Sequence, residues 1–191
     1  GPQGVDWLAV WGTDPNDVYA AGKGGLLARY NGLAWTVIGG PVTGTLRGVW
    51  ASSDKDVWAV GEGAAIYHSK GDGSWKPVQI EPYQIPQQDP KIIKEDLYAI
   101  WGSGPDDIWA VGTPDKHSEA TLLHYDGKVW QFVPALGTET RLFRAIWGWH
   151  KGSILFVGTQ GMVYHYNGSE FSELPSGSIT TFHDVCGFGK D

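Results

Sequence analysis

The stretch LAVWGTDPNDVYAAG at residues 8–22 decides the fold, because the chain repeats it. Related copies are RGVWASSDKDVWAVG at 47–61, YAIWGSGPDDIWAVG at 98–112 and RAIWGWHKGSILFVG at 144–158, and HDVCGFGKD at 183–191 begins a fifth. Aligning the copies superimposes Trp11, Trp50, Trp101, Trp147 and Cys186, which are 39, 51, 46 and 39 residues apart. The mean period of about 44 residues is in the range of β-propeller blades. Each copy therefore predicts one blade.

The composition is that of a globular chain with many short strands. Of the 191 residues, 41% are hydrophobic and 13% aromatic, and the 28 glycines lie at repeat positions rather than in a low-complexity run. The net charge of −7 and the absence of a Lys/Arg run argue against a nucleic-acid or anionic-membrane partner. No apolar run approaches the roughly 18 residues of a membrane span, so we expect no membrane insertion.

Four short strands are predicted in each repeat. In the second repeat they fall at 46–50, 57–61, 64–68 and 75–78, and all are rich in Val, Ile, Tyr and Trp. The turn between the third and fourth strands carries Asn31-Gly32, Asp72-Gly73, Asp126-Gly127 and Asn167-Gly168. These dipeptides favour tight hairpins, so each repeat predicts an antiparallel meander.

The predicted fold class is an all-β propeller with four complete four-stranded blades and the first strand of a fifth. The blades span about 5–38, 45–80, 96–133 and 141–174, and the partial blade spans 180–191. A surplus inner strand favours a segment of a longer propeller. One alternative is that the fifth strand competes with residues 5–11 for one place in the ring. The other is a homodimer of two four-blade halves that completes a larger ring, because open β edges are prone to association.

Recurring residue types are expected to pack in the core. Trp11, Trp50, Trp101 and Trp147 on the first strand, with Tyr19, Trp58, Trp109 and Phe156 on the second, should fill the space between blades. Cys186 stands where the other copies have Trp and should be a buried thiol. Asp17, Asp56 and Asp107 should cap turns, and His68, His124 and His165 should pack rather than bind a metal. We predict no metal and no cofactor.

The segment WAVGEGAAIYHSKGDGSW at 58–75, with its relatives in the other repeats, resembles the Asp-box (BNR-type) β-propeller repeat. The family pattern Ser/Thr-x-Asp-x-Gly-x-Thr-Trp is degenerate here, where 69–75 reads SKGDGSW. The family includes sialidases, photosystem assembly factors, sortilin-like receptors and many secreted bacterial proteins. The resemblance therefore implies the fold and an extracellular or cell-surface location, but no particular chemistry.

Departures from the repeat mark the candidate binding site. The insertions 81–95 and 113–120 are expected on one face of the disc, where loops on a repeat scaffold commonly bind partners. On the same face, the residue three before each anchor varies, which predicts a polar ring at the channel mouth. The ligand-binding candidates are Arg47, Tyr98, Arg144 and His183 from this position, and Tyr83, Gln87 and His117 from the insertions. The ring could bind an anion or sugar, or its arginines could form salt bridges with Asp6, Glu95 or Asp184.

These patterns predict a non-catalytic binding or scaffold module that presents 81–95 and 113–120 to a protein partner. A lectin-like, glycan-binding propeller is the alternative. A sialidase-like glycoside hydrolase is a weaker alternative, because no carboxylate pair of the kind that glycosidases use stands out and Gln84-Ile85-Pro86 lacks the Arg of the sialidase motif.

Overall fold

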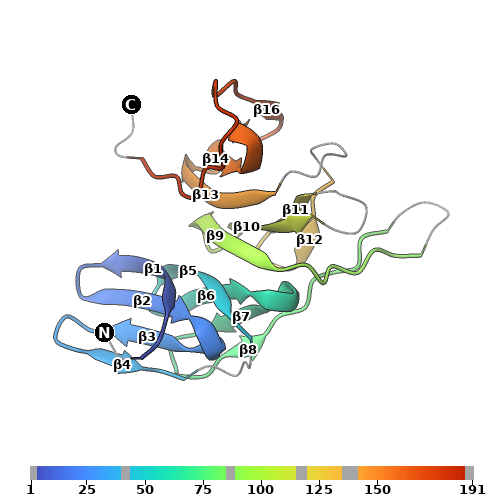
Figure 1. Ribbon diagram of the computed structural model, residues 1–191. Helices are drawn as coiled ribbons and strands as arrows, with labels where there is room; N and C mark the ends of the chain where they lie inside the picture. Colours follow the sequence, from blue (N-terminus) through green and yellow to red (C-terminus); the bar gives the residue numbers. More distant parts are fainter. Residues whose placement is uncertain (1–3, 40–43, 85–88, 115–119, 135–141, 188–191) are drawn as a thin grey trace.

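The computed structural model describes residues 4–39, 44–84, 89–114, 120–134 and 142–187. They form four antiparallel sheets of four strands each, and the sheets are blades of a β-propeller (Figure 1). Blade 1 contains β1 (Trp7–Asp14), β2 (Asp17–Gly22), β3 (Leu27–Tyr30) and β4 (Trp35–Val37), and blade 2 contains β5 (Leu46–Ser53), β6 (Asp56–Gly61), β7 (Ile66–Ser69) and β8 (Lys76–Pro77). Blade 3 contains β9 (Leu97–Gly104), β10 (Asp107–Pro114), β11 (Ala120–Tyr125) and β12 (Trp130–Phe132), and blade 4 contains β13 (Phe143–His150), β14 (Ser153–Gly158), β15 (Val163–Tyr166) and β16 (Phe171–Glu173).

Turn chemistry explains why each sheet is a meander. In the predicted Asn-Gly and Asp-Gly hairpins, Gly32 and Gly127 both have φ of 89°, a left-handed conformation that glycine adopts without strain. Between the second and third strands, blades 1, 2 and 4 make a single 3₁₀ turn: η1 (Lys23–Gly25), η2 (Glu62–Ala64) and η3 (Thr159–Gly161).

The inner strands β1, β5, β9 and β13 lie next to one another in this order. Between blades, the anchor tryptophan of one inner strand packs against the next. A methyl group at Gly102 would lie 2.8 Å from the Trp50 ring, and one at Gly148 would lie 2.7 Å from the Trp101 ring. In blade 1, Trp11 Nε1 donates a hydrogen bond to the Ala51 carbonyl, at 2.9 Å. The same position thus contacts the following blade each time.

The second strand of each blade supplies the second layer of interblade packing. Trp58 contacts Tyr125 and Trp130 of blade 3, with ring centroids 4.9 and 5.7 Å away. Trp109 makes the equivalent contacts with Tyr166 and Phe171 of blade 4. Trp50, Trp58, Trp101, Trp109, Tyr19 and Phe156 are buried, as the repeat predicted, whereas Trp11 and Trp147 are half-buried. In blade 4, Leu155 rather than Phe156 pairs with Trp147, so Phe156 points back toward Trp109.

The fifth copy occupies the place of an inner strand but is not a strand. Residues 181–187 have no strand assignment, although the Gly187 backbone lies against the Trp147 ring as Gly148 lies against Trp101. The prediction that Cys186 is buried is wrong, because the side chain is exposed. No further blade packs over it within the described residues, which explains the difference.

Replacing Gly102 with alanine should destabilise the protein by about 1 to 3 kcal/mol, because the added methyl group forces the Trp50 ring out of its place. Gly104→Ala is the control, since a methyl group there meets its nearest neighbour at 3.4 Å. Urea unfolding followed by tryptophan fluorescence measures both variants. Equal stabilities for the two would show that the indole contact does not constrain blade spacing.

Candidate functional site

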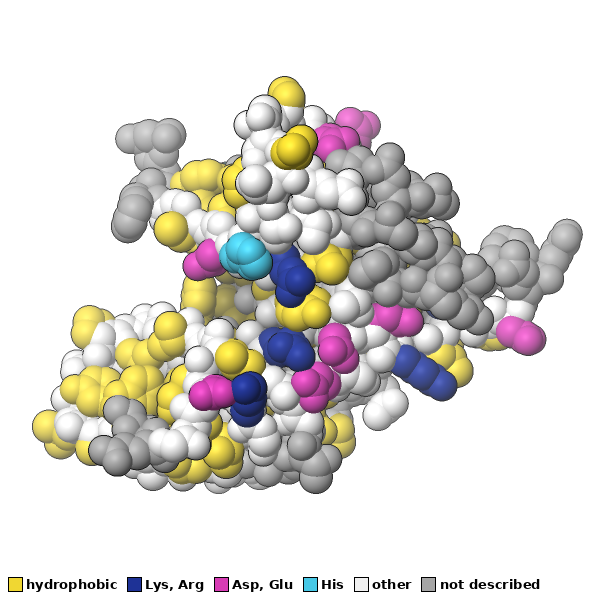
Figure 2. All heavy atoms as spheres, viewed as in Figure 1, with side chains coloured by type: hydrophobic (Ala, Val, Ile, Leu, Met, Phe, Trp, Pro, Cys, Tyr) yellow, Lys and Arg dark blue, Asp and Glu magenta, His cyan; other side chains and the backbone are white. Residues whose placement is uncertain are grey.

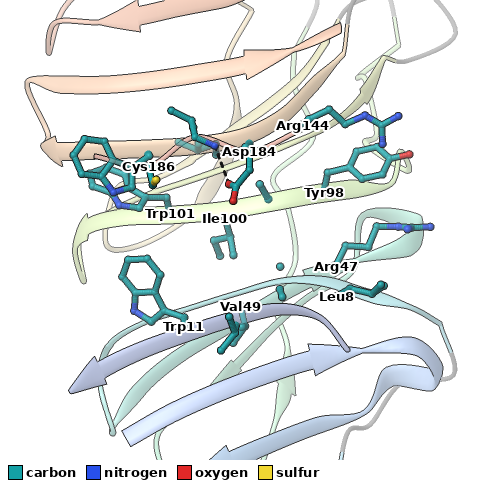
Figure 3. A pocket seen from close by; sticks show the side chains of 18 of the residues that line it. Leu8, Trp11, Arg47, Val49, Tyr98, Ile100, Trp101, Arg144, Asp184 and Cys186 are labelled. Carbon is teal, nitrogen blue, oxygen red and sulfur yellow. Dashed lines mark hydrogen bonds between the residues drawn. The ribbon is translucent and has the colours of Figure 1, made fainter. Parts of the chain in front are cut away.

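A cavity of about 820 Å³ opens between the inner strands at the centre of the blades (Figure 3). Its walls include Arg47, Tyr98, Arg144 and His183, so the structure brings together the four residues predicted from the variable inner-strand position. In Figure 3, Arg47, Tyr98 and Arg144 gather at one end of the pocket, and Trp11, Trp101 and Cys186 lie at the other. Basic and histidine side chains border the hollow seen in Figure 2. One end of the cavity is therefore polar and cationic.

Tyr98 lies between two arginines at this mouth. The guanidinium carbon of Arg144 is 4.4 Å from the centre of the Tyr98 ring, and that of Arg47 is 5.2 Å away. Such cation–π contacts fix the direction of long side chains while leaving their N–H donors available. The Tyr98 ring therefore contacts both cations at the mouth.

The two arginines differ in their counter-ions. Arg47 pairs with Glu62 at 3.0 Å and lies 3.9 Å from Asp96. Hydrogen bonds from Thr45, together with the Arg47 charge, hold the pKa of Glu62 below its usual value. The salt-bridge alternative therefore holds for Arg47, but its partners are not the expected Asp6, Glu95 or Asp184.

Arg144 has no acidic partner among the described residues, and its Nε is buried without a hydrogen bond. Asp6, one of the acids expected to neutralise the mouth, is paired with Lys23 instead. Asp184 also lines the cavity, but its carboxylate accepts a hydrogen bond from the Val185 backbone N–H. Arg144 is thus held in place by Tyr98 with its charge uncompensated by these residues.

The candidates from the insertions lie elsewhere. Tyr83 packs against Phe132 on the outer strand of blade 3, at 5.4 Å between ring centres, and its backbone pairs with Lys91. It is not among the residues that line the mouth cavity. Gln87 and His117 lie outside the described residues. The sequence therefore located the mouth cluster, and Tyr83, a candidate from the insertion, lies apart from it.

A second set of polar residues, which sequence reasoning assigned to turns and packing, forms partly buried hydrogen-bond networks. In blade 2, the Asp56 carboxylate accepts hydrogen bonds from Ser52 (2.5 Å), Trp58 Nε1 (2.8 Å) and His68 Nε2 (2.8 Å). The His68 ring stacks on Trp58 at 4.1 Å. One carboxylate thus connects three strands of the blade.

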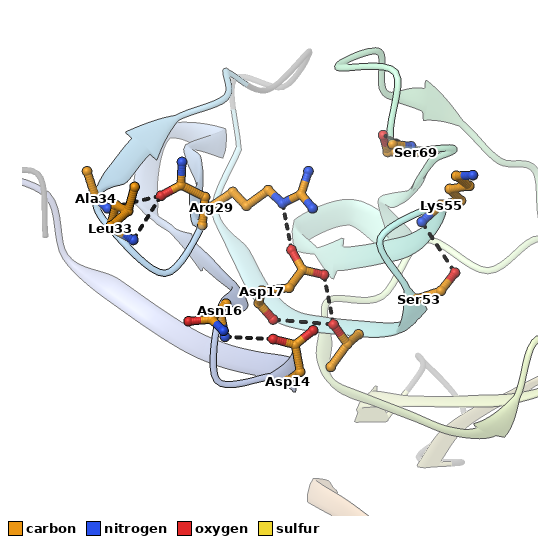
Figure 4. Close-up of polar contacts among 12 residues, drawn as sticks. Asp14, Asn16, Asp17, Arg29, Leu33, Ala34, Ser53, Lys55 and Ser69 are labelled. Carbon is orange, nitrogen blue, oxygen red and sulfur yellow. Dashed lines mark hydrogen bonds and ion pairs between the residues drawn. The ribbon is translucent and has the colours of Figure 1, made fainter.

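The other blades vary this network. Blade 3 repeats it with Ser103, Asp107, Trp109 and His124. In blade 1, Asp17 accepts hydrogen bonds from Thr13 at 2.7 Å and Arg29 at 2.6 Å (Figure 4). In blade 4, Ser153 pairs with His165 without an acid. The signal in the sequence was that an Asp and a His both recur at corresponding repeat positions in blades 2 and 3, which single-residue reasoning missed.

The networks keep their aspartates ionised. Burial raises the pKa of Asp56, but hydrogen bonds from His68, Ser52 and Trp58 outweigh burial and lower it below the ordinary value of 3.8. The pKa of Asp107 is lowered in the same way, by hydrogen bonds from His124, Ser103 and Trp109. A carboxylate already satisfied by three donors is poorly placed to act as a base. Among the described residues, no cluster of three or more His, Cys, Asp or Glu is arranged to hold a metal ion.

Neither a family model nor a curated protein matches the sequence. Among solved structures, the chain is similar to the WD40 β-propeller domain of Doa1, with a TM-score of 0.59, 12% identity, and coverage of 96% of this chain and 56% of that one. It is similar to YCF48 bound to D1 peptide (TM-score 0.50, 14% identity, 92% of this chain and 68% of that one). It is also similar to an ancestral GH74 enzyme (TM-score 0.63, 15% identity, 88% and 24%).

At these identities the likeness shows the β-propeller fold alone. The chain spans little more than half of the Doa1 domain. In the part of the chain that the structure describes, no helix is long and apolar enough to cross a membrane.

Replacing Asp56 with asparagine should cost about 1 to 3 kcal/mol of stability at pH 7, because a half-buried carboxylate that accepts three hydrogen bonds is lost. Asp54→Asn, an exposed change two residues away, is the control. Because the folded-state pKa is lowered, the carboxylate stabilises the native protein above pH 3.8, and this contribution disappears as the pH falls through the lowered value. Urea titrations at pH 7 and pH 3 should therefore show a smaller loss of stability on acidification in Asp56→Asn than in the parent protein. An identical acid response in the two proteins would contradict the network.

Proposed function

We propose that this chain is a non-catalytic β-propeller module that binds a protein or peptide partner, and that the channel mouth accepts an acidic group of that partner. The observation that carries the proposal is Arg144, a cation stacked 4.4 Å from Tyr98 at the cavity mouth without an acidic partner among the described residues. An arginine held by an aromatic ring is pre-organised for a carboxylate, because little side-chain freedom is lost on binding.

The burial of the recurring aromatic side chains favours a protein partner over a glycan. A glycan-binding propeller with repeated sites would need exposed aromatic rings at equivalent places in each blade. The recurring Trp50, Trp58, Trp101 and Trp109 are instead buried between blades. The similar YCF48 structure is described as bound to a peptide, which supports the same class of partner for this chain.

The carboxylates support a non-catalytic role. Asp56 and Asp107, the recurring acids, are engaged with histidine, serine and tryptophan inside their blades. The mouth presents cations and a tyrosine rather than the two acids that a glycosidase places across its substrate. For these two reasons we do not propose a sialidase-like activity.

The insertion 81–95 is proposed as a second contact surface for the same partner. Its described residues follow the outer edge of blade 3, where the Glu81 backbone N–H donates to the Trp130 carbonyl. Lys91 lies 3.8 Å above the Phe132 ring. The surface is away from the mouth, so a partner that touches both must extend across blade 3. The insertion 113–120, mostly outside the described residues, remains part of the proposal.

A fluorescein-labelled Glu-Gly octapeptide and its Gln-Gly counterpart probe the mouth by fluorescence anisotropy. We expect the acidic peptide to bind and the neutral peptide to bind at least about tenfold more weakly, with affinity falling as NaCl is raised because the contact is ionic. Arg144→Gln should remove most of the difference between the peptides.

Lys151→Gln is the matched control, because it removes the same charge from the turn at the opposite end of β13. Tyr98→Ala should weaken acidic-peptide binding as Arg144→Gln does, since Arg144 then loses its support. Equal binding of the two peptides, or equal loss in Arg144→Gln and Lys151→Gln, would refute the proposed site.

A further inference from the structure

The face of blade 1 that points away from blade 2 is an uncovered copy of an interblade face. Trp11 points toward blade 2, so its neighbour Val10 on the inner strand points the other way. Val10 is 66% exposed, whereas Val49, Ile100 and Ile146 at the same position in the other blades are 4%, 7% and 7% exposed. The chain thus carries a core residue at a place where its own blades leave it in solvent.

The exposure extends across the same face to the outer strands. Val18, which pairs with Gly12, is only half-buried, whereas Ile108 and Ile154 at its position in blades 3 and 4 are fully buried. Trp35 of β4 is half-buried, and its counterpart Trp130 is fully buried by blade 2. Apolar surface that continues over several strands of a soluble protein marks an interaction site.

Gly12 lacks the tryptophan contact that its counterparts in blades 3 and 4 have. In blades 3 and 4 the equivalent glycine is covered by the tryptophan of the preceding blade, as Trp50 covers Gly102. The three atoms nearest to a methyl group at Gly12 all belong to its own blade, and the closest is in Val18 at 3.3 Å. Gly12 therefore presents the site for an indole ring that no described residue fills.

In blade 4, at the other end of the row of blades, Trp147 supplies the complementary indole ring. Its ring lies against Gly187, where a methyl group would be 2.6 Å away. The segment 183–187 copies 8–12 residue by residue, with Gly187 in the place of Gly12 and Val185 in the place of Val10. This segment is not paired in a sheet. Its neighbourhood is tied to blade 4 by hydrogen bonds from Phe182 N to Gly158 O and from Gly161 N to Thr180 O.

We propose that a second copy of this chain docks on the open face of blade 1. In this dimer, β1 of each copy takes the place of the segment 183–187 of the other copy against that copy's blade 4. Gly12 of each copy then lies beneath Trp147 of the other, and the two equivalent contacts close a ring around a two-fold axis. The exchange places a complete blade 1 against blade 4 in place of the unpaired segment 183–187. The open face of blade 1 is thereby buried.

The number of described blades fits this occupant. Because propellers close with roughly four to eight blades, two copies supply the number for one large ring. The mouth cluster would then be present twice around one channel. The proposal does not depend on peptide binding, since the docking face lies on Val10, Gly12 and Trp35 rather than on Arg144.

Sedimentation equilibrium of the full chain, over a range of concentrations, measures the association. We expect a monomer–dimer equilibrium that Val10→Asp shifts to monomer, because the charge would be buried at the interface. Gly12→Val should have the same effect, because its side chain fills the place of the partner's indole. Ile92→Asp is the matched control: Ile92 is also exposed, at 63%, but lies in the connection between blades 2 and 3.

Gly187→Val should act in the opposite direction. Its side chain collides with Trp147 in the same copy, releases the segment, and frees the edge of blade 4 for the partner's β1. We expect dimerisation to tighten by about tenfold or more. Circular dichroism checks that each variant is folded, and acidic-peptide binding by a monomeric variant is read separately. Strictly monomeric parent and Gly187→Val proteins, or a dimer that survives both Val10→Asp and Gly12→Val, would overturn the proposal.

Discussion

The contact on which this architecture depends is an indole ring packed against the backbone of the next inner strand. It requires a large flat side chain in one blade and the absence of a bulky one in the next, and the repeat supplies Trp followed by Gly or Ala at this point. Close approach also explains the small residue two positions earlier, because a methyl group at Gly48 would lie 3.1 Å from Ile100. The spacing between blades is therefore set at the innermost strand, where the blades converge.

Further from the axis, partly buried polar networks link the strands within a blade. The hydrogen bonds of Asp56 link the strand β5 to β6 and β7, and those of Asp107 do the same in blade 3. Blade 1 uses Arg29 in place of histidine, so that its Asp17 is neutralised by a permanent charge. Because these acids are occupied within the blades, they do not neutralise the cations at the mouth. The electrostatic character of the site thus follows from where the fold places its carboxylates.

The period of the Trp-Gly phrase was enough to predict the fold class, because blade packing demands the same residues at the same positions each time. The mouth cluster of Arg47, Tyr98 and Arg144 could also be predicted, since one variable position in an invariant strand points to the channel. The position of Tyr83 could not be predicted, because a loop's path depends on tertiary contacts such as that with Phe132. The burial expected of Cys186 failed for a related reason: repeat position indicates burial only when a neighbouring blade is present to cover it.

Exposure of Val10 and exposure of Cys186 thus have one physical origin, at opposite ends of the same row of blades. Each is a core position of the repeat without its neighbour, and the cavity that contains the mouth cluster extends to both. The channel mouth is consequently bordered on one side by surfaces built for packing rather than for solvent. Closing the row would enclose the cavity and lower its local dielectric, which strengthens the interaction of the uncompensated Arg144 with an anion. Ring closure and ligand affinity are therefore expected to be coupled through the shape of a single cavity, although they rest on different residues.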